Sequence, residues 1–219
     1  FEALARWHHP RLGILSPNAF LPLASDMHLG GDLLLAMLRH LCRDASRWPE
    51  HLTISINVSP VQLCDAQLAR QILRVVYAAG LDPRRLIIEV TEEAALDNPK
   101  AASDAIQSFR HAGIGIALDD FGSGHASFDR LSKLEIDQLK IDRTLIHAMD
   151  SVRGRKLVQA IVNLGRTLSM TVTAEGIETA EQANFAWQAH CDWGQGYYFG
   201  KPIASDDALN LATSDRRFT

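Results

Sequence analysis

The stretch Ile114-Gly-Ile-Ala-Leu-Asp-Asp-Phe-Gly-Ser-Gly124 combines a buried-strand pattern with two adjacent carboxylates. Its apolar first half, with small residues at Gly115 and Ala117, indicates a strand in the core. Asp119 and Asp120 end this strand, and a glycine-spaced loop that can bring backbone close to a ligand follows them. Because burying two unpaired carboxylates side by side is costly, such a pair usually needs a cation. A lone Asp-Asp pair is more often one helix cap and one solvated acid. Whether this pair binds a cation therefore depends on whether other strand ends of the chain carry similar residues.

Strand-like and helical patterns alternate along the whole chain. The seven strand-like runs are Phe1–Trp7, Thr53–Ser59, Leu86–Glu92, Ile114–Asp120, Ile136–Asp142, Met170–Glu175 and Gly194–Phe199. The main predicted helices are Gly31–Arg47, Asp65–Ala79, Pro99–Ala112, Ser151–Leu168 and one from about Thr179. We expect His8-His9-Pro10 to break the first strand, with both histidines on the surface. This order predicts an α/β fold made of βαβ units with a parallel sheet.

Polar residues recur where these predicted strands end. The five positions are Asn57, Glu89, Asp119, Lys140 and Glu175. A glutamate inside an apolar strand is unusual, because burial penalises its charge. A lysine in a strand is more often an edge residue, but Lys140 occupies the same relative position as the acids. The carboxyl ends of strands in a parallel barrel share one rim, where active sites are built, so the pattern predicts a site there.

Carboxylates with an amide oxygen form a hard-oxygen cage that suits magnesium or manganese and not zinc. Lys140 and Arg6 beside such a cage suit an anionic substrate, most simply a phosphate ester. Two metals that share a bridging aspartate can ionise a water and neutralise charge on the attacking and departing oxygens. The residues therefore favour metal-dependent phosphoester hydrolysis and leave open a metal-dependent aldolase or enolase-type barrel. No glycine fingerprint for a dinucleotide or nucleoside triphosphate is present.

Composition narrows the class of protein. The formal net charge of -4 gives no support to binding of a nucleic acid polymer. Three cysteines lie far apart without metal-like spacing, which indicates reduced thiols in a cytosolic protein. No apolar run approaches the ~18 residues of a membrane span, and the start does not resemble a signal peptide. The chain begins inside a strand-like run, so we expect a single domain, residues 1–219, excised from a longer protein.

Glu2-Ala3-Leu4 followed by Arg6 resembles the motif that names the EAL domain family, the cyclic di-GMP phosphodiesterases. The further matching motifs, in chain order, are Asn57-Val-Ser59, Glu89-Val-Thr-Glu92, Asp119-Asp-Phe-Gly-Ser-Gly124, Leu139-Lys-Ile-Asp142, Ala174-Glu-Gly-Ile-Glu178 and Gln195-Gly-Tyr-Tyr-Phe199. The resemblance covers almost the whole chain. It implies a TIM-like (βα)8 barrel with one antiparallel strand. That strand precedes the name motif in the family, supplies a guanine contact, and is absent from this sequence.

The resemblance also implies a role for individual residues. One metal would be held by Glu2, Asn57, Glu89 and Asp119. The second would be held by Asp119, Asp120 and Glu175, with Asp119 bridging. Substrate contacts are implied for Leu4, Arg6, Asp120 and Lys140. The implied catalytic set is Glu92, Lys140, Glu175 and Gln195, in which Glu92 anchors the loop Phe121–Gly124 between the metal site and a dimer interface.

The implied reaction is in-line attack of an activated water on one phosphodiester of cyclic di-GMP, giving linear pGpG with two Mg²⁺ or Mn²⁺ ions. A catalytically silent cyclic di-GMP receptor is the alternative, because degenerate family members lose acidic ligands; here all are present. We further expect a homodimer in a bacterial signalling protein with an upstream sensor or GGDEF-type domain. We expect a cytoplasmic domain that makes no membrane contact itself, although the full-length protein could be membrane-anchored. Departures from the family pattern are Ser123, His125 and Glu135, none of them in the implied metal shell.

Overall fold

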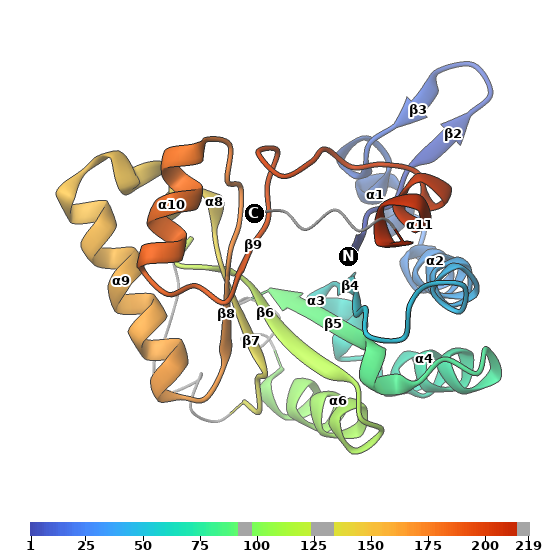
Figure 1. Cartoon of the computed structure of the whole chain (residues 1–219). Helices are drawn as coiled ribbons and strands as arrows, with labels where there is room; N and C mark the ends of the chain where they lie inside the picture. The colour runs from blue at the N-terminus through green and yellow to red at the C-terminus, as the bar shows by residue number, and fades with distance from the viewer. Residues whose placement is uncertain (92–97, 124–133, 214–219) are drawn as a thin grey trace.

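The structure, a computed structural model, describes residues 1–91, 98–123 and 134–213 and contains one seven-stranded sheet (Figure 1). Its strands in spatial order are β1 (Glu2–Ala3), β4 (Ile54–Val58), β5 (Leu86–Thr91), β6 (Gly115–Phe121), β7 (Gln138–Ile141), β8 (Thr171–Ala174) and β9 (Trp193–Gly194). Every neighbouring pair is parallel, and the spatial order equals the order in the chain. Each of the seven strand-like runs therefore contributes residues to one parallel sheet. The predicted strand Gly194–Phe199 is wrong beyond Gly194, because β9 ends there and residues 195–199 form a loop and a turn. The first run contributes only Glu2–Ala3 to this sheet.

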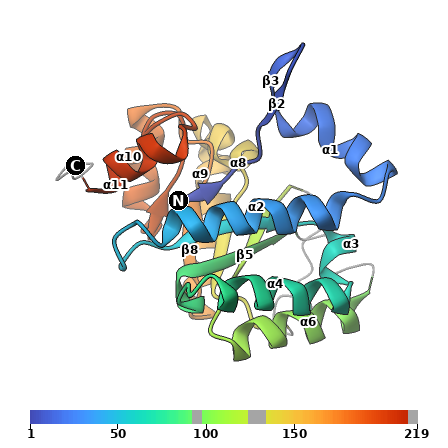
Figure 2. The ribbon, with the colours of Figure 1, turned by 90° about the vertical axis from the view of Figure 1, so that its right-hand side faces the viewer.

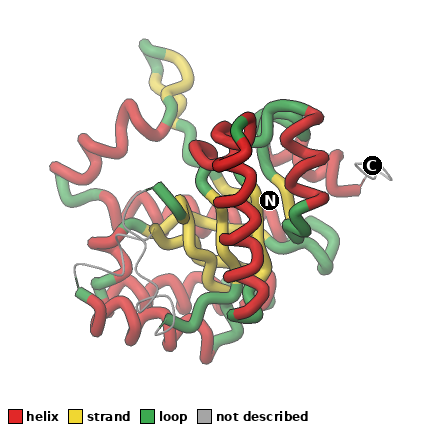
Figure 3. Tube along the Cα trace, turned by 90° about the vertical axis from the view of Figure 1, so that its left-hand side faces the viewer, coloured by secondary structure: helices red, strands yellow, loops and turns green. Residues whose placement is uncertain are grey.

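Helices connect successive strands of this sheet. The main ones are α2 (Gly30–Ala45), α4 (Ala66–Ala78), α6 (Pro99–His111), α9 (Val152–Thr167) and α10 (Ala180–Gln188). The other helical elements are α1 (Pro17–Asp26), α3 (Pro60–Leu63), α8 (Arg143–His147), α11 (Ser205–Thr213) and the 3₁₀ turns η1 (Pro83–Arg85) and η2 (Ala148–Asp150). Figure 2 shows α2 and α4 packed side by side, and Figure 3 shows the strands surrounded by helices. The α4 helix begins where the carboxylate of Asp65 accepts hydrogen bonds from two backbone amides of its first turn.

The two faces of the sheet have opposite chemistry. Side chains at Ile54, Ile56 and Val58 point outward and are buried in one hydrophobic core together with those of the covering helices. Residues at matching register positions of neighbouring strands share a face, so the pairing of Asn57 with Glu89 places both on the inner face. The inner face therefore collects the polar residues, and the outer face supplies the hydrophobic stabilisation of the fold.

The sheet curls until its two edge strands approach each other at the carboxyl rim. The side-chain amide of Gln195, directly after β9, donates a hydrogen bond of 2.6 Å to Glu2 in β1. No backbone ladder joins β1 to β9 within the described residues. The fold is that of a TIM-like barrel fragment, and in the described part of the chain its sheet contains no antiparallel strand.

Antiparallel pairing occurs instead in a separate hairpin that projects from the barrel (Figures 1 and 2). Its strands are β2 (Trp7–His9) and β3 (Gly13–Leu15). The expected strand break at the two adjacent histidines is wrong, because both lie in β2. The ring nitrogen Nδ1 of His9 accepts hydrogen bonds from the backbone amides of Arg11 (3.2 Å) and Leu12 (3.1 Å), which stabilises the turn. Pro10 therefore begins a turn in the hairpin.

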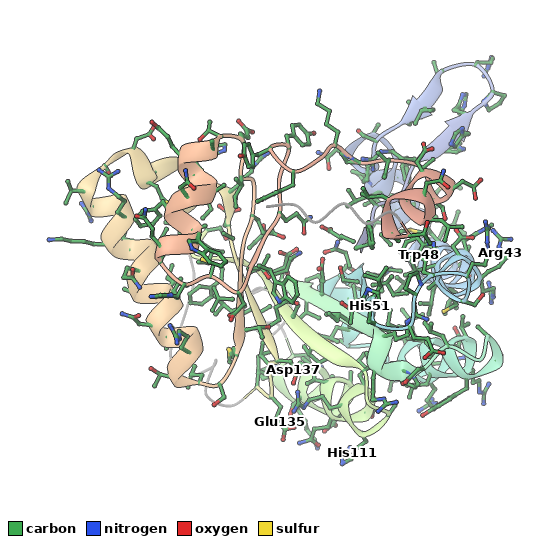
Figure 4. All side chains as sticks on the ribbon, in the orientation of Figure 1. Arg43, Trp48, His51, His111, Glu135 and Asp137 are labelled. Carbon is green, nitrogen blue, oxygen red and sulfur yellow. The ribbon has the colours of Figure 1, made fainter. Side chains whose placement is uncertain are left out.

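The amino end of the barrel carries a separate ionic cluster (Figure 4). Arg110, in the last turn of α6, forms an ion pair of 2.9 Å with Glu135 and a second ion pair with Asp137. Asp137 also accepts a hydrogen bond of 2.8 Å from the backbone amide of Ile116 in β6. A depression of about 380 Å³ beside it is lined by Gln107, Arg110, His111 and Glu135. Glu135 thus ties α6 to the start of β7 and stands apart from the carboxylates at the rim.

Two further observations concern membrane-spanning helices and cysteine thiols. Among the described residues, no helix combines the length and hydrophobicity needed to cross a bilayer. Cys42, Cys64 and Cys191 are all free thiols, and burial raises the pKa of Cys42 and Cys191 to about 11. These two thiols therefore stay protonated near neutral pH and are unreactive.

Candidate active site

The ammonium group of Lys140 lies at the centre of a cluster of carboxylates on the inner face of the sheet. Its Nζ atom is 2.8 Å from Glu89 Oε2, 2.8 Å from Glu175 Oε1 and 3.2 Å from Asp119 Oδ1. Glu2 Oε2 lies 3.9 Å away. The four acids come from β1, β5, β6 and the residue after β8, so residues far apart in the chain converge at the carboxyl rim. Lys140 and Glu89 are only 2% and 3% exposed, which makes this a buried charge cluster.

A bulge in β6 brings two consecutive aspartates to the same side. Successive residues of a regular strand point to opposite faces. Here the pairing register between β6 and β7 shifts between Leu118 and Phe121, and Asp120 has a φ of 55°. This φ lies in the left-handed region, which is uncommon for residues other than glycine and is most tolerable for Asp and Asn. As a result Asp119, Asp120 and Glu175 each place one oxygen within 4.8 Å of the others.

Two amide side chains hold Glu2 in place. The Nδ2 group of Asn57 donates a hydrogen bond of 2.8 Å to Glu2 Oε1, and Gln195 Nε2 donates one of 2.6 Å to Glu2 Oε2. Both oxygens of this carboxylate are therefore fixed by residues from β4 and from the segment after β9. The predicted residues Glu2, Asn57 and Gln195 thus lie together and orient one acid toward Lys140.

The cluster carries more negative charge than one lysine can balance. Burial raises the pKa of Glu89 to about 7 and that of Glu175 to about 8, and neighbouring carboxylates add to both shifts while Lys140 opposes them. Burial by itself would lower the pKa of Lys140, but the surrounding acids outweigh it and raise that pKa far above its ordinary value. Burial, followed by the charge of Asp119, also raises the pKa of Asp120. The site therefore favours additional positive charge.

This donor set fits a divalent metal ion. Carboxylate oxygens are the ligands that Mg²⁺ and Mn²⁺ prefer, and three of them already lie close enough to share one ion. Two buried atoms, Glu89 Oε2 and Lys140 Nζ, contact each other as an ion pair but make no well-aligned hydrogen bond in the described part of the chain. A bound cation would satisfy the unmet Glu89 oxygen and the acids with raised pKa values, whereas the Lys140 ammonium would be satisfied by an anion or a water.

The remaining predicted residues lie differently. Leu4 and Arg6 are exposed on the connection between β1 and β2, and the Arg6 guanidinium donates a hydrogen bond of 2.7 Å to the Ala5 carbonyl. Among the described ion pairs, none joins Arg6 to the carboxylates. Glu92 and the end of the predicted loop at Gly124 lie outside the described residues, so the role of Glu92 stays a prediction.

Asp142 is an acid at the site to which no role was assigned from sequence. It follows β7 directly, is 8% exposed, and its carboxylate accepts a hydrogen bond from the carboxyl group of Asp120 when Asp120 is protonated. It also caps α8, because the backbone amide of Thr144 donates to it at 2.9 Å. The sequence signal for Asp142 is its spacing of two residues from Lys140, since residues i and i+2 of a strand face the same side.

Comparison with known proteins identifies the family to which the chain belongs. The sequence model described as the EAL domain matches residues 1–202 of the chain. The chain belongs to the EAL domain family. This match confirms the resemblance drawn from the Glu2-Ala3-Leu4 motif and the six motifs that follow it.

Similar proteins include curated sequences and solved structures. An uncharacterized signaling protein of Caulobacter vibrioides is 39% identical over 98% of this chain and 26% of its own length. The bifunctional diguanylate cyclase/cyclic di-GMP phosphodiesterase MucR of Pseudomonas aeruginosa is 36% identical over 95% of this chain and 31% of its own. A structure of the MucR phosphodiesterase in complex with cyclic di-GMP superposes with a TM-score of 0.89 at 34% identity, covering 95% of this chain and 86% of that one. The EAL domain thus spans about a quarter to a third of these curated relatives.

Proposed function

We propose that this EAL domain hydrolyses one phosphodiester bond of cyclic di-GMP and releases linear pGpG. The observation that carries the proposal is the buried ammonium of Lys140 within 3.2 Å of Glu89, Asp119 and Glu175. Relatives with named activities support the choice of substrate, since MucR and NbdA of Pseudomonas aeruginosa are both named as cyclic di-GMP phosphodiesterases. NbdA is 35% identical over 92% of this chain and 26% of its own length. An aldolase or enolase chemistry has no support from these relatives.

We propose that the acids hold two divalent ions, Mg²⁺ or Mn²⁺. Glu2, Asn57, Glu89 and Asp119 form the first ligand set. Asp119, Asp120 and Glu175 form the second. When bound, such ions supply Lewis acidity, a lowered pKa for water and charge stabilisation on both sides of an in-line displacement. The support for the second set is the convergence of the oxygens of Asp119, Asp120 and Glu175 and the raised pKa values of Asp120 and Glu175. The support for the first set is that Glu2, Glu89 and Asp119 all approach Lys140, that Asn57 hydrogen-bonds to Glu2, and that the pKa of Glu89 is raised.

The residues of the chain supply orientation and positive charge. The ammonium of Lys140 would lie beside the anionic phosphate and the attacking water. Because Lys140 is buried, its electrostatic attraction for the phosphate is stronger than it would be in water. Gln195 and Asn57 keep Glu2 in one orientation by donating to both of its oxygens. Arg6 and Leu4 lie next to Glu2 in sequence, which suits contacts to the substrate phosphate and base.

Incubation with cyclic di-GMP and Mg²⁺, followed by ion-exchange chromatography, tests the proposal. The expected result is conversion to pGpG, lost on addition of EDTA and in an Asp119→Asn variant. Intact cyclic di-GMP together with tight binding would instead favour a silent receptor. Absence of both turnover and binding would contradict both functions.

We further propose that the domain acts as a homodimer in the cytoplasm, within a longer bacterial protein that carries a sensor or GGDEF-type domain. The greater length of the curated relatives and the name of MucR, which includes diguanylate cyclase activity, support the longer protein and the GGDEF-type domain. The dimer and the cytoplasmic location are expectations from the family resemblance. Sedimentation equilibrium at micromolar concentration tests the dimer. A monomer at every concentration would contradict it.

A further inference from the structure

The hairpin of β2 and β3 and the neighbouring helix α1 carry an exposed apolar surface. Leu12 and Ile14 in the hairpin are 68% and 65% exposed. Leu21 and Leu23 in α1, and Met27 directly after it, are exposed as well. We call these residues the apolar arm. Figures 1 and 2 show that the hairpin projects from the barrel and that α1 lies beside its base. Several exposed apolar side chains on neighbouring elements mark a surface that contacts something else.

A contact between two aromatic rings fixes the hairpin to α1. Trp7 in β2 packs edge-on against Phe20 in α1, with 5.9 Å between the ring centres, and Phe20 is buried. Across the hairpin Trp7 pairs with Leu15, and His8 pairs with Ile14. Successive residues of a strand point to opposite faces, so Ile14 lies on the face of the hairpin opposite Trp7. That face is turned away from α1 and is open to a partner.

The hairpin has no third strand among the described residues. Its two strands form a sheet of their own, so each strand has one edge whose backbone groups face no neighbouring strand in the described part of the chain. A two-stranded hairpin is marginally stable in water, and further strands with an apolar face stabilise it. An exposed strand edge can pair with a strand of another chain. The hairpin therefore offers a partner both apolar area and backbone hydrogen bonds.

The charge of the arm favours a second copy of this chain as that partner. Between Trp7 and Ser25 the only residue with a formal charge at neutral pH is Arg11. In a twofold-symmetric interface the same surface faces itself, so a surface with little charge avoids like-charge repulsion. Contact with an anionic membrane draws instead on clusters of lysine and arginine, which this stretch lacks. A strongly charged protein partner would likewise find no complementary cluster there.

We propose that two copies of this chain associate through the apolar arm, with the arm of one copy packed against the arm of the other. The inference rests on the proposed homodimer and names its interface. The family resemblance implies a different place, beside the loop Phe121–Gly124. The buried centre of a homodimer interface is more apolar than the rest of the surface, which suits Leu12 and Ile14. A stable interface buries about 800 Å² on each partner, so the exposed residues of α1 would extend it.

Analytical ultracentrifugation of substituted chains tests the interface. For Leu12→Asp and Ile14→Asp we expect the dissociation constant of the dimer to rise at least about 100-fold, because each substitution occurs twice in a symmetric interface and buries two unpaired carboxylates. Both side chains are exposed in the single chain, so the variants should keep the far-UV circular dichroism of wild type. Leu12→Met and Ile14→Val keep the surface apolar and should associate like wild type. The matched control is Val61→Asp on α3, because Val61 is 81% exposed and lies outside the arm.

A mixture of oppositely charged variants provides a second readout. Ile14→Asp and Ile14→Lys should each be monomeric by themselves. Equal amounts of the two should form a heterodimer when mixed, because each arm then meets the opposite charge on the other. A mixture that stays monomeric would show that the substitutions disrupt the hairpin and would refute a symmetric arm-to-arm contact.

The sedimentation results separate this inference from the proposals on which it rests. If wild type dimerises and both arm variants match Val61→Asp, the inference is wrong and the homodimer stands. If wild type is a monomer at every concentration, the homodimer and the inference are both wrong. Turnover of cyclic di-GMP is measured separately, so the proposed hydrolysis stands or falls by itself. Binding of monomeric wild type to phosphatidylglycerol vesicles, abolished by Ile14→Asp, would assign the arm to a membrane surface and overturn the inference.

Discussion

Replacement of Lys140 by Met should destabilise the metal-free protein strongly and in a pH-dependent way. The ammonium contacts two carboxylates at 2.8 Å and a third at 3.2 Å, and it is 2% exposed. Removing one member of a buried ionic cluster leaves uncompensated charge and costs about 3–5 kcal/mol. For a domain of this size each kcal/mol lowers Tm by about 2–4 °C, so a loss of roughly 10 °C is expected at pH 8.5.

The penalty should shrink as the pH falls. Glu89 and Glu175 have pKa values of about 7 and about 8 in the folded protein, above the ordinary value of 4.5. Lys140 lowers both, so its removal raises them further. A carboxyl whose folded-state pKa is raised is stabilised in its protonated form, and that stabilisation is lost as the pH rises through the raised pKa. At pH 6 both glutamates can take up protons, and Lys140→Met should then lie closer to wild type.

Thermal unfolding in EDTA at pH 6 and pH 8.5 measures this effect. The control is Lys100→Met, which removes an exposed lysine on α6 and should leave Tm unchanged at both pH values. An equal loss of Tm at both pH values would show that the methionine disrupts packing and not charge balance. A variant as stable as wild type at pH 8.5 would refute the view that Lys140 neutralises a buried acidic cluster.

Three other predictions follow from the same geometry. Glu175→Gln should reduce turnover of cyclic di-GMP at least about 100-fold while sparing its binding, as seen by chromatography and calorimetry; near-normal hydrolysis would show a misassigned residue. In EDTA, Tm of wild type should fall between pH 5 and 8.5 as Glu89 and Glu175 ionise, and Glu89→Gln or added Mg²⁺ should weaken that trend; an unchanged slope would count against the raised pKa values. Gly196→Ala should lose activity because its Cβ would meet the Ile177 carbonyl at 2.1 Å, whereas Gly200→Ala, with nothing within 4 Å, should retain it; equal activities would argue against a fixed turn.

The site residues at the strand ends could be predicted because they are charged or polar residues within otherwise apolar runs. A charged residue such as Glu89 or Lys140 inside an apolar run is costly unless it has a function, and the period of two fixes the face on which it lies. The structure confirms that these residues meet at one rim. Sequence alone could not place Lys140 between the acids, since that depends on the curl of the whole sheet.

Local irregularities escaped prediction for a physical reason. The bulge that turns Asp120 toward the site depends on a left-handed φ at a non-glycine residue, which the surrounding structure must impose. The hairpin of β2 and β3 was missed because a proline after two histidines is typical of a strand end, whereas His9 here accepts two backbone hydrogen bonds across the turn. Asp142 was missed because an N-cap acid has the same local pattern whether or not it faces a site.

Binding of Mn²⁺ to the purified chain, measured by titration calorimetry at pH 8, tests most directly whether the converging acids form a metal site. We predict two ions per chain for wild type and loss of both in Asp119→Asn, because Asp119 belongs to both ligand sets. The control Asp104→Asn removes an exposed acid on α6 and should bind like wild type. No binding by wild type, or unchanged binding by Asp119→Asn, would contradict the account.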